Sequence, residues 1–170
     1  NPKKIMSWDY IGKIIEDGSL FKTKDLKLDF SSMVDYQSLD KNPINANRTI
    51  TIPSNIENLY LIGPNNVTQS IIYNSLSINV AFRKKDNPLS IHLKNISFKG
   101  DSNQNEANGV AIACESSSPI NLFIEGNVSI FGNNNSAINV QNLNIFDEEE
   151  EVGFLTVVGG LGSDAINVSN

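Results

Sequence analysis

The sequence predicts an all-β fold, a right-handed parallel β-solenoid with an N-terminal capping helix. The chain contains many short segments in which apolar and polar residues alternate, as in strands with one buried face. Similar segments recur at intervals of roughly 26–32 residues, which is typical of a fold built from stacked repeats. The sequence also contains 25 asparagines, many of them between the apolar segments, where a solenoid needs tight turns.

The predicted strands begin near residue 48 and continue to the end of the chain. Many are only three to five residues long, which is short for an all-β domain but suits the sides of a solenoid coil. The predicted strands are Thr49–Ile52, Leu59–Ile62, Leu76–Val80, Leu89–Leu93, Ile96–Phe98, Val110–Ile112, Ile120–Ile124, Val128–Ile130, Ala137–Val140, Leu143–Ile145, Phe154–Val158 and Ala165–Val168.

Internal repetition indicates how successive coils align. The segment Asn95–Gly100 recurs as Asn127–Gly132, 32 residues later. The segment Ser136–Val140 recurs as Asp164–Val168, 28 residues later. Fixed offsets of this kind are expected when each repeat forms one coil and the corners absorb insertions.

Stacked repeats place equivalent residues of successive coils above one another. We expect Ile112, Ile138 and Ile166 to form one internal column, and Ile96 and Val128 to belong to another. The competing fold is an antiparallel β-sandwich, which would need Asn-Gly or similar hairpin turns between its strands. Only one Asn-Gly pair occurs, and it does not join two clear strands, so the sequence favours the solenoid.

Residues 1–47 differ from the rest of the chain and are predicted to cap the solenoid. A short helix is predicted over residues 7–17, with Trp8 and Ile15 among the apolar residues on one side. Such a helix would cover the open end of the first coil. The coils are assigned to residues 48–170 and are expected to continue beyond them, because the last strand is followed by no comparable cap.

Composition and charge argue against several classes of protein. The chain has 170 residues, of which 39% are hydrophobic, and a net charge of −6. A nucleic-acid partner is not expected, because the basic residues bunch only at Lys22–Lys27 and Arg83–Lys85, which are interpreted as solvated faces or loops. A membrane span is not expected, because no apolar segment reaches the roughly 18–20 residues that one requires. The single cysteine, Cys114, is interpreted as a small buried residue rather than a nucleophile.

Glycine-containing segments in the second half of the chain carry a family resemblance. They resemble the pectate-lyase-like β-helical repeats of bacterial, mostly Gram-positive, wall and surface proteins. The resemblance implies a right-handed parallel β-helix, a secreted or cell-surface location and, for many members, carbohydrate binding. Asn139 and Asn167 stand where that family often has a second glycine. The matching segments are Gly153–Gly160 followed by Ser163–Ile166 and, more loosely, Gly126–Gly132 followed by Ser136–Ile138.

The acidic residues do not form the pattern of a catalytic site. A polysaccharide lyase or hydrolase on this scaffold would place acids at equivalent positions of adjacent coils. Asp164 instead aligns with Ser136, and Glu125 has no acidic counterpart in the last coil. We therefore expect a protein that is not an enzyme and that needs no cofactor. The acids considered are Asp101, Glu106, Glu115, Glu125 and Asp164.

His92 and the acidic run Asp147–Glu151 are the remaining candidates for proton or metal chemistry. His92 alternates outward in its strand and is interpreted as a solvated position. Without a second histidine or a cysteine cluster, no zinc site is expected. The acidic run is interpreted as a charged loop, with calcium binding as the alternative, although it lacks the Asp/Asn/Gly spacing of a dedicated calcium loop.

Outward aromatic residues are the candidate ligand-binding positions, because a sugar ring can stack on an exposed aromatic face. Tyr60 lies between two core-facing leucines and should face outward, and Tyr73 follows two isoleucines at the end of an apolar segment. These two tyrosines are the predicted platforms. Tyr36, Phe131 and Phe146 are further aromatic residues outside the clear core pattern.

Together these features predict a non-catalytic, adhesin-like module that is secreted or displayed at a cell surface. It would bind a glycan or host ligand as part of a longer protein. One alternative is a structural stalk segment of a larger adhesin or toxin, and another is part of a polysaccharide lyase or hydrolase. An outward cluster of Tyr and Asn would favour the binding module. A uniformly polar outer surface would favour the stalk, and a groove lined by acidic residues would favour the enzyme.

Overall fold

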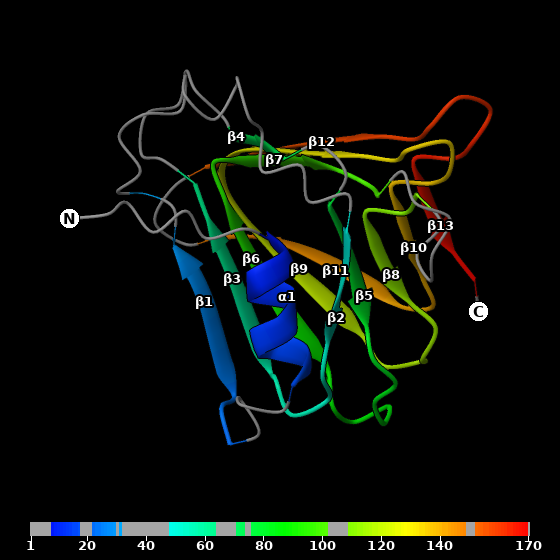
Figure 1. Cartoon of the computed structure of the whole chain (residues 1–170). Helices are drawn as coiled ribbons and strands as arrows, with labels where there is room; N and C mark the ends of the chain where they lie inside the picture. Colours follow the sequence, from blue (N-terminus) through cyan, green and yellow to red (C-terminus); the bar gives the residue numbers. More distant parts are fainter. Residues whose placement is uncertain are drawn as a thin grey trace.

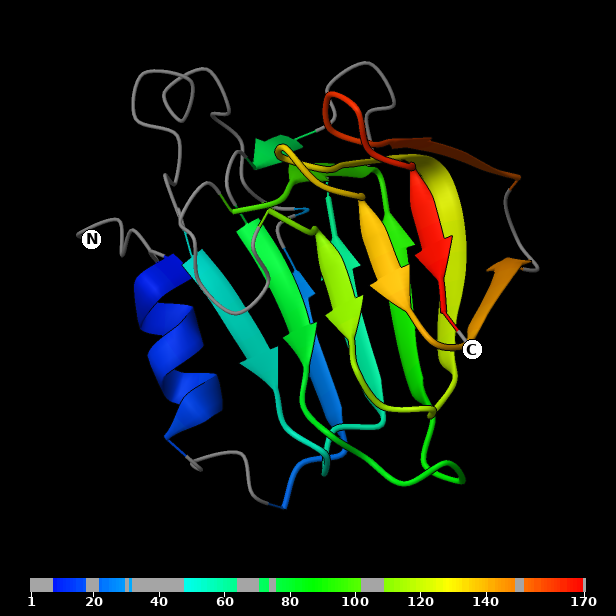
Figure 2. The same cartoon turned by 90° about the vertical axis from the view of Figure 1, so that its right-hand side faces the viewer.

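The computed structural model describes residues 8–17, 22–29, 31, 48–63, 71–73, 76–101, 109–148 and 152–169. These residues form a β-solenoid of parallel sheets with a short helix at one end (Figures 1 and 2). The elements are α1 (Trp8–Glu16), β1 (Asp25–Asp29), β2 (Arg48–Ile52), β3 (Asn58–Ile62), β4 (Ile71–Tyr73), β5 (Leu76–Val80), β6 (Leu89–Lys94), β7 (Ile96–Lys99), β8 (Ile112–Cys114), β9 (Ile120–Phe131), β10 (Ile138–Val140), β11 (Leu143–Asp147), β12 (Gly153–Val158) and β13 (Ile166–Val168).

The strands form three parallel sheets, named A, B and C, one on each side of the solenoid. Sheet A contains β1, β3, β6, the first half of β9 and β11. Sheet B contains β2, β5, β8, β10 and β13. Sheet C contains β4, β7, the second half of β9 and β12. From β3 onward the described chain passes through A, C and B in turn, as in β3-β4-β5 and β6-β7-β8, so each of these coils adds one strand, or one half of β9, to every sheet.

The corner between sheets A and C depends on two residues with left-handed backbone conformation. Asn95, between β6 and β7, has a φ of 47°, and Gly126, inside β9, has a φ of 64°. The side-chain Oδ1 of Asn95 accepts a hydrogen bond from the N–H of Asn127 at 3.1 Å. A Cβ on Gly126 would lie 1.9 Å from that oxygen. Glycine at position 126 therefore satisfies both the backbone angle and the close packing of the neighbouring coil.

The strand register confirms the predicted columns. Ile138 of β10 pairs with Ile112 of β8 on one side and with Ile166 of β13 on the other. Ser97 of β7 pairs with Ser129 of β9, which places Ile96 and Val128 at equivalent positions one residue earlier. The offsets between repeated segments in the sequence are therefore the lengths of the coils.

The core lies between the three sheets and is made of their inward side chains. Alternate residues of each strand point into it, so the outward residues form rows along the outside of the solenoid. The buried apolar residues include Leu59, Ile91 and Leu122 from sheet A, Ile78, Ile112 and Ile138 from sheet B, and Phe98, Val128 and Ile130 from sheet C.

The predicted N-terminal helix is confirmed as α1, which packs against β2 with Ile15 buried in the core. Figure 2 shows α1 at one end of the solenoid and the red β13 at the opposite end. β1 also lies within the segment 1–47 and forms the edge of sheet A, so this segment contributes a strand as well as the helix. In the described part of the chain, no helix is long and apolar enough to cross a membrane.

Several strand boundaries differ from the prediction. Val110 and Ala111 precede the strand that they were expected to open, because β8 begins at Ile112. The two segments predicted at Ile120–Ile124 and Val128–Ile130 form one strand, β9, which turns from sheet A into sheet C. In the previous coil the same corner is formed by the single residue Asn95 between β6 and β7.

The last coil keeps the register of the others but exposes its inward side chains. Ile166 and Val168 pair with Ile138 and Val140, yet their exposed fractions are 37% and 47%, against 0% and 1% for the residues of β10. Among the described strands, β13 has a neighbour on one edge only. The apolar column therefore reaches solvent at this end.

Candidate functional site on the outer face of sheet A

Four outward side chains stack in register along sheet A. Tyr60 of β3, His92 of β6, Phe123 of β9 and Phe146 of β11 occupy equivalent positions of successive strands. Their ring centroids lie 4.2, 4.7 and 5.1 Å apart, and the ring planes are within 23° of parallel. We call these four residues the aromatic ladder. Stacked rings at such distances are favourable, and the strand spacing sets the interval between them.

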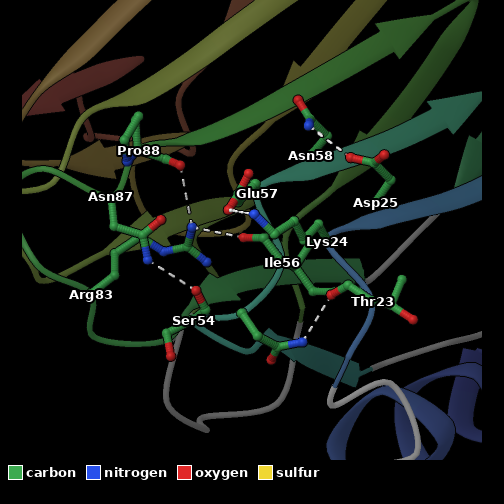
Figure 3. Close-up of polar contacts among 11 residues, drawn as sticks. Thr23, Lys24, Asp25, Ser54, Ile56, Glu57, Asn58, Arg83, Asn87 and Pro88 are labelled. Carbon is green, nitrogen blue, oxygen red and sulfur yellow. Dashed lines mark hydrogen bonds and ion pairs between the residues drawn. The ribbon is translucent and has the colours of Figure 1, made fainter.

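A row of hydrogen-bonding side chains runs beside the aromatic ladder, two residues earlier in each strand. This polar row consists of Asn58, Ser90, Asn121 and Asn144. The side-chain amide of Asn144 donates to Oδ1 of Asn121 at 2.9 Å. The amide of Asn58 donates to the carboxylate of Asp25 in β1 at 2.8 Å (Figure 3). These hydrogen bonds join side chains of neighbouring strands and so link successive coils.

Charged side chains form the other border of the aromatic ladder. Nζ of Lys94 in β6 lies 2.8 Å from Oε1 of Glu125 in β9, and both side chains are largely shielded from solvent. Glu148, directly after β11, reaches back and places Oε1 2.7 Å from Nδ1 of His92. Since β9 lies between β6 and β11, this contact bridges the whole width of β9.

The stacking determines which parts of the rings a ligand can reach. His92 and Phe123 have a ring on each side, so both of their faces are covered. Tyr60 has one face covered by His92, and Phe146 has one face covered by Phe123. Phe146 is 45% exposed and presents its second face at the end of the ladder. The two inner rungs offer ring edges rather than ring faces, and the second face of Tyr60 lies on the side of Lys27 in β1.

The aromatic residues that the sequence singled out lie in different places. Tyr60 faces outward as expected and forms one rung of the aromatic ladder. The backbone of Tyr73 lies in β4, paired with Phe98, but its side chain lies outside the described residues, as does the whole of Tyr36. Phe131 is half-buried on sheet C and so lies away from the ladder.

His92 was interpreted as a solvated position, and this is only partly correct. It faces outward, but its ring lies between Tyr60 and Phe123 and both ring nitrogens have partners. His92 and Phe123 were not recognised as rungs from the sequence. Spacing is the signal that could have identified them. His92 follows Tyr60 by 32 residues and Phe123 follows His92 by 31, and all three residues lie at the centre of aligned strands.

The buried position of Arg83 shows that one interpretation of the sequence was wrong. Arg83 was grouped with two lysines as a solvated basic segment, but its side chain is buried at the corner between sheets B and A (Figure 3). The guanidinium donates to the carbonyl oxygens of Ile56 at 2.9 Å, Pro53 at 3.0 Å and, more weakly, Pro88 at 3.5 Å. Nε has no partner. Burial lowers the pKa of Arg83, and the carboxylate of Glu57 opposes this effect.

The predicted acidic candidates are dispersed. Asp101 is buried at the end of sheet C, where its carboxylate accepts a hydrogen bond from Thr49 and its backbone N–H donates to Ser77. Glu125 pairs with Lys94 in sheet A, while Glu115 and Asp164 are exposed in turns near sheet B. Within the described ranges, no three His, Cys, Asp or Glu side chains are grouped so that they could hold a metal ion. Glu106 and residues 149–151 of the acidic run lie outside those ranges.

Cys114 is buried, as predicted, with its thiol 3.2 Å from the hydroxyl of Ser116. The thiol therefore belongs to the interior of sheet B and is not part of an exposed site.

Charge is distributed unevenly along the solenoid. Residues 1–99 contain 13 basic and 9 acidic residues, a net charge of +4, whereas residues 100–170 contain 10 acidic and no basic residues, a net charge of −10. Since the coils follow one another in chain order, the outer face of sheet A changes from Lys27 beside Tyr60 at one end to Glu148 after β11 at the other.

Comparison with known proteins gives no relative. No family model matches the chain, and no curated protein or solved structure matches it either. The parallel β-solenoid is compatible with the fold that the pectate-lyase-like resemblance implies.

Proposed function

We propose that the chain is a non-catalytic binding module whose ligand is a glycan bound on the outer face of sheet A. One observation supports this most strongly. Aromatic residues and asparagines gather on this face, in the aromatic ladder and the polar row beside it. Amide groups both donate and accept hydrogen bonds, which suits the hydroxyl groups of sugars.

The arrangement favours a ligand that lies lengthwise along the solenoid. Successive members of the polar row belong to neighbouring strands, which are about 4.8 Å apart, so donors and acceptors repeat along the solenoid axis. Apolar contact would come from ring edges and from the free face of Phe146. An adhesin-like setting, secreted or at a cell surface within a longer protein, is part of the same proposal and is motivated by the family resemblance.

A purely structural stalk is the second candidate, and it too has a supporting observation. The ring faces of the aromatic ladder are mostly occupied by one another, and Asn121 and Asn144 bond to each other. These contacts stabilise the stacking of coils without any ligand. A stalk needs such ladders and needs no binding surface.

A glycan array with matched variants distinguishes the two candidates. The unmodified chain should bind a set of wall polysaccharides or host mucin glycans saturably, and the double variant Asn121→Ala/Asn144→Ala should lose most of that binding. Tyr60→Ala and Phe146→Ala should weaken it. Phe82→Ala is the control, because Phe82 is 80% exposed but lies in the segment between β5 and β6, outside the strands of sheet A.

Folding must be checked in parallel, since the same residues stabilise the sheet. Circular dichroism melts should show that the amide variants remain folded at the temperature of the array. A folded, unmodified chain that binds no glycan would contradict the binding proposal and leave the structural stalk. Equal loss of binding in the Phe82 control would show that contact is non-specific.

A further inference from the structure

His92 occupies an unusual position for an outward strand residue, because four groups surround its ring. Tyr60 and Phe123 lie against its two faces at centroid distances of 4.2 and 4.7 Å. Oε1 of Glu148 lies 2.7 Å from Nδ1, and Oδ1 of Asn58 lies 3.4 Å from Nε2. The imidazole therefore has an aromatic face on each side and an oxygen at each nitrogen.

Both of those oxygens are hydrogen-bond acceptors. The Glu148 carboxylate accepts whenever it is ionised. The orientation of the Asn58 amide is fixed by its other contact, since its Nδ2 donates to the Asp25 carboxylate at 2.8 Å (Figure 3). A carboxylate can only accept, so the amide nitrogen must face Asp25 and the carbonyl oxygen must face His92.

A neutral imidazole has one N–H and would leave a lone pair facing one of these oxygens, whereas the imidazolium has an N–H for each. The flanking rings act in the same direction, because aromatic faces attract a cation. We infer that His92 is the proton-sensitive centre of a clasp, formed in its imidazolium state, that ties Glu148 after β11 to β6 across β9 and, through Asn58 and Asp25, to β3 and β1.

The other charged groups around the clasp come from each neighbouring strand. Lys27 of β1 stands next to Tyr60 in the row of the ladder, and Asp147 ends β11. Lys94 and Glu125, two residues further along β6 and β9, are paired with each other at 2.8 Å. Glu148 is thus the carboxylate in direct contact with His92, and the Lys94–Glu125 pair is already neutralised.

Loss of the proton removes the charge on which the Glu148 contact depends. Neutral imidazole can still donate one hydrogen bond, but the ion pair and the second N–H are gone. The backbone N–H of Glu148 still donates to the carbonyl oxygen of Ile124 in β9 at 3.1 Å, so it is the side chain of Glu148 that loses its tie to β6. The clasp therefore stabilises the fold while both ring nitrogens of His92 carry a proton, and this contribution is lost when one of those protons leaves.

A double-mutant cycle at two pH values tests the clasp independently of any glycan ligand. The chain, His92→Gln, Glu148→Gln and the double variant are unfolded with urea at pH 5.5 and pH 8.5. At pH 5.5 the coupling between the two positions should change the unfolding equilibrium constant by roughly two- to fivefold, as for a partly exposed ion pair. At pH 8.5 the coupling should be clearly smaller, because a neutral imidazole keeps one N–H and forms no ion pair.

Two further measurements show whether the proton is responsible. His92 is the sole histidine, so the ¹⁵N signals of one ring report its protonation directly, and the coupling should fall in step with the loss of that proton. Glu115→Gln removes an equal charge from an exposed turn after β8 and should show no coupling to His92. Coupling that is absent at pH 5.5, or that is unchanged at pH 8.5, would overturn the inference.

Discussion

Replacing Ile138 with alanine should destabilise the solenoid strongly, whereas the same change at Ile166 should be mild. The two residues are adjacent members of one column and have the same side chain. Ile138 is 0% exposed and lies between Ile112 and Ile166, so the substitution leaves an enclosed cavity. Changes of this kind cost about 2–5 kcal/mol. That is a large part of the roughly 5–15 kcal/mol that stabilises a typical domain.

Ile166 supplies the matched control because it is 37% exposed. Full burial of an isoleucine side chain is worth about 1.5–3 kcal/mol, and about two-thirds of the side chain of Ile166 is buried. Alanine keeps the Cβ, and solvent can fill the space that remains. We therefore expect Ile166→Ala to cost about 1 kcal/mol.

The assay is urea unfolding of both variants, followed by far-ultraviolet circular dichroism and fitted with a shared slope. Aspartate at the same positions extends the test, because Ile138→Asp would bury an unpaired charge and should abolish cooperative unfolding. Ile166→Asp should leave a folded protein. If the two alanine variants lost the same free energy of unfolding, the column as described would be refuted. The two positions share one register, and the expected difference rests only on how deeply each side chain is buried.

Three further predictions concern single side chains. Arg83→Met should cost on the order of 3 kcal/mol in urea unfolding, because buried carbonyl oxygens lose their donor, and Arg83→Lys should recover only part of this. Gly126→Ala should cost more than Gly162→Ala; both positions have positive φ, but an added Cβ at 126 meets the neighbouring asparagine side chain and at 162 meets nothing within 4 Å. Equal melting temperatures for the two glycine variants would contradict the proposed packing. Hydrogen bonds from Ser31 lower the pKa of Asp29 below its ordinary 3.8, so Ser31→Ala should be slightly less stable than the unmodified chain at pH 6 and equal to it once acid protonates the carboxylate. The difference should be a few tenths of a kcal/mol because Asp29 is exposed, and a variant that loses as much stability at pH 2 would exclude the carboxylate as its cause.

Repetition made the sheets and the columns predictable from the sequence. In a parallel solenoid, the length of a coil equals the offset between equivalent residues, so the recurrence of Asn95–Gly100 as Asn127–Gly132 sets the pairing of β7 with β9. Alternation then determines which residues face the core. Together these two signals were sufficient to place Ile138 between Ile112 and Ile166.

The sequence did not predict features that depend on contacts with a neighbouring coil or on where a long side chain ends. β1 has the sequence Asp-Leu-Lys-Leu-Asp, whose outward charges suit the edge of a sheet but hide the strand signal. Arg83 resembles a solvated residue beside two lysines, and only the folded corner brings three carbonyl oxygens around it. The contact of Glu148 with His92 crosses an intervening strand, so neither alternation nor offset predicts it.

The place of a ring in the aromatic ladder determines whether that ring can contribute to stability alone or also to binding. Phe123 contacts rings on both sides, and stacked aromatic pairs are each worth about 0.5–1.5 kcal/mol beyond their buried area. Phe146 has one such neighbour and one free face, beside Asn144 at the exposed end of the polar row. An inner rung therefore serves stability whichever function is correct, because its faces are already occupied. The binding module and the stalk differ most clearly at the last rung, because the second face of the Phe146 ring takes no part in the stacking of the ladder.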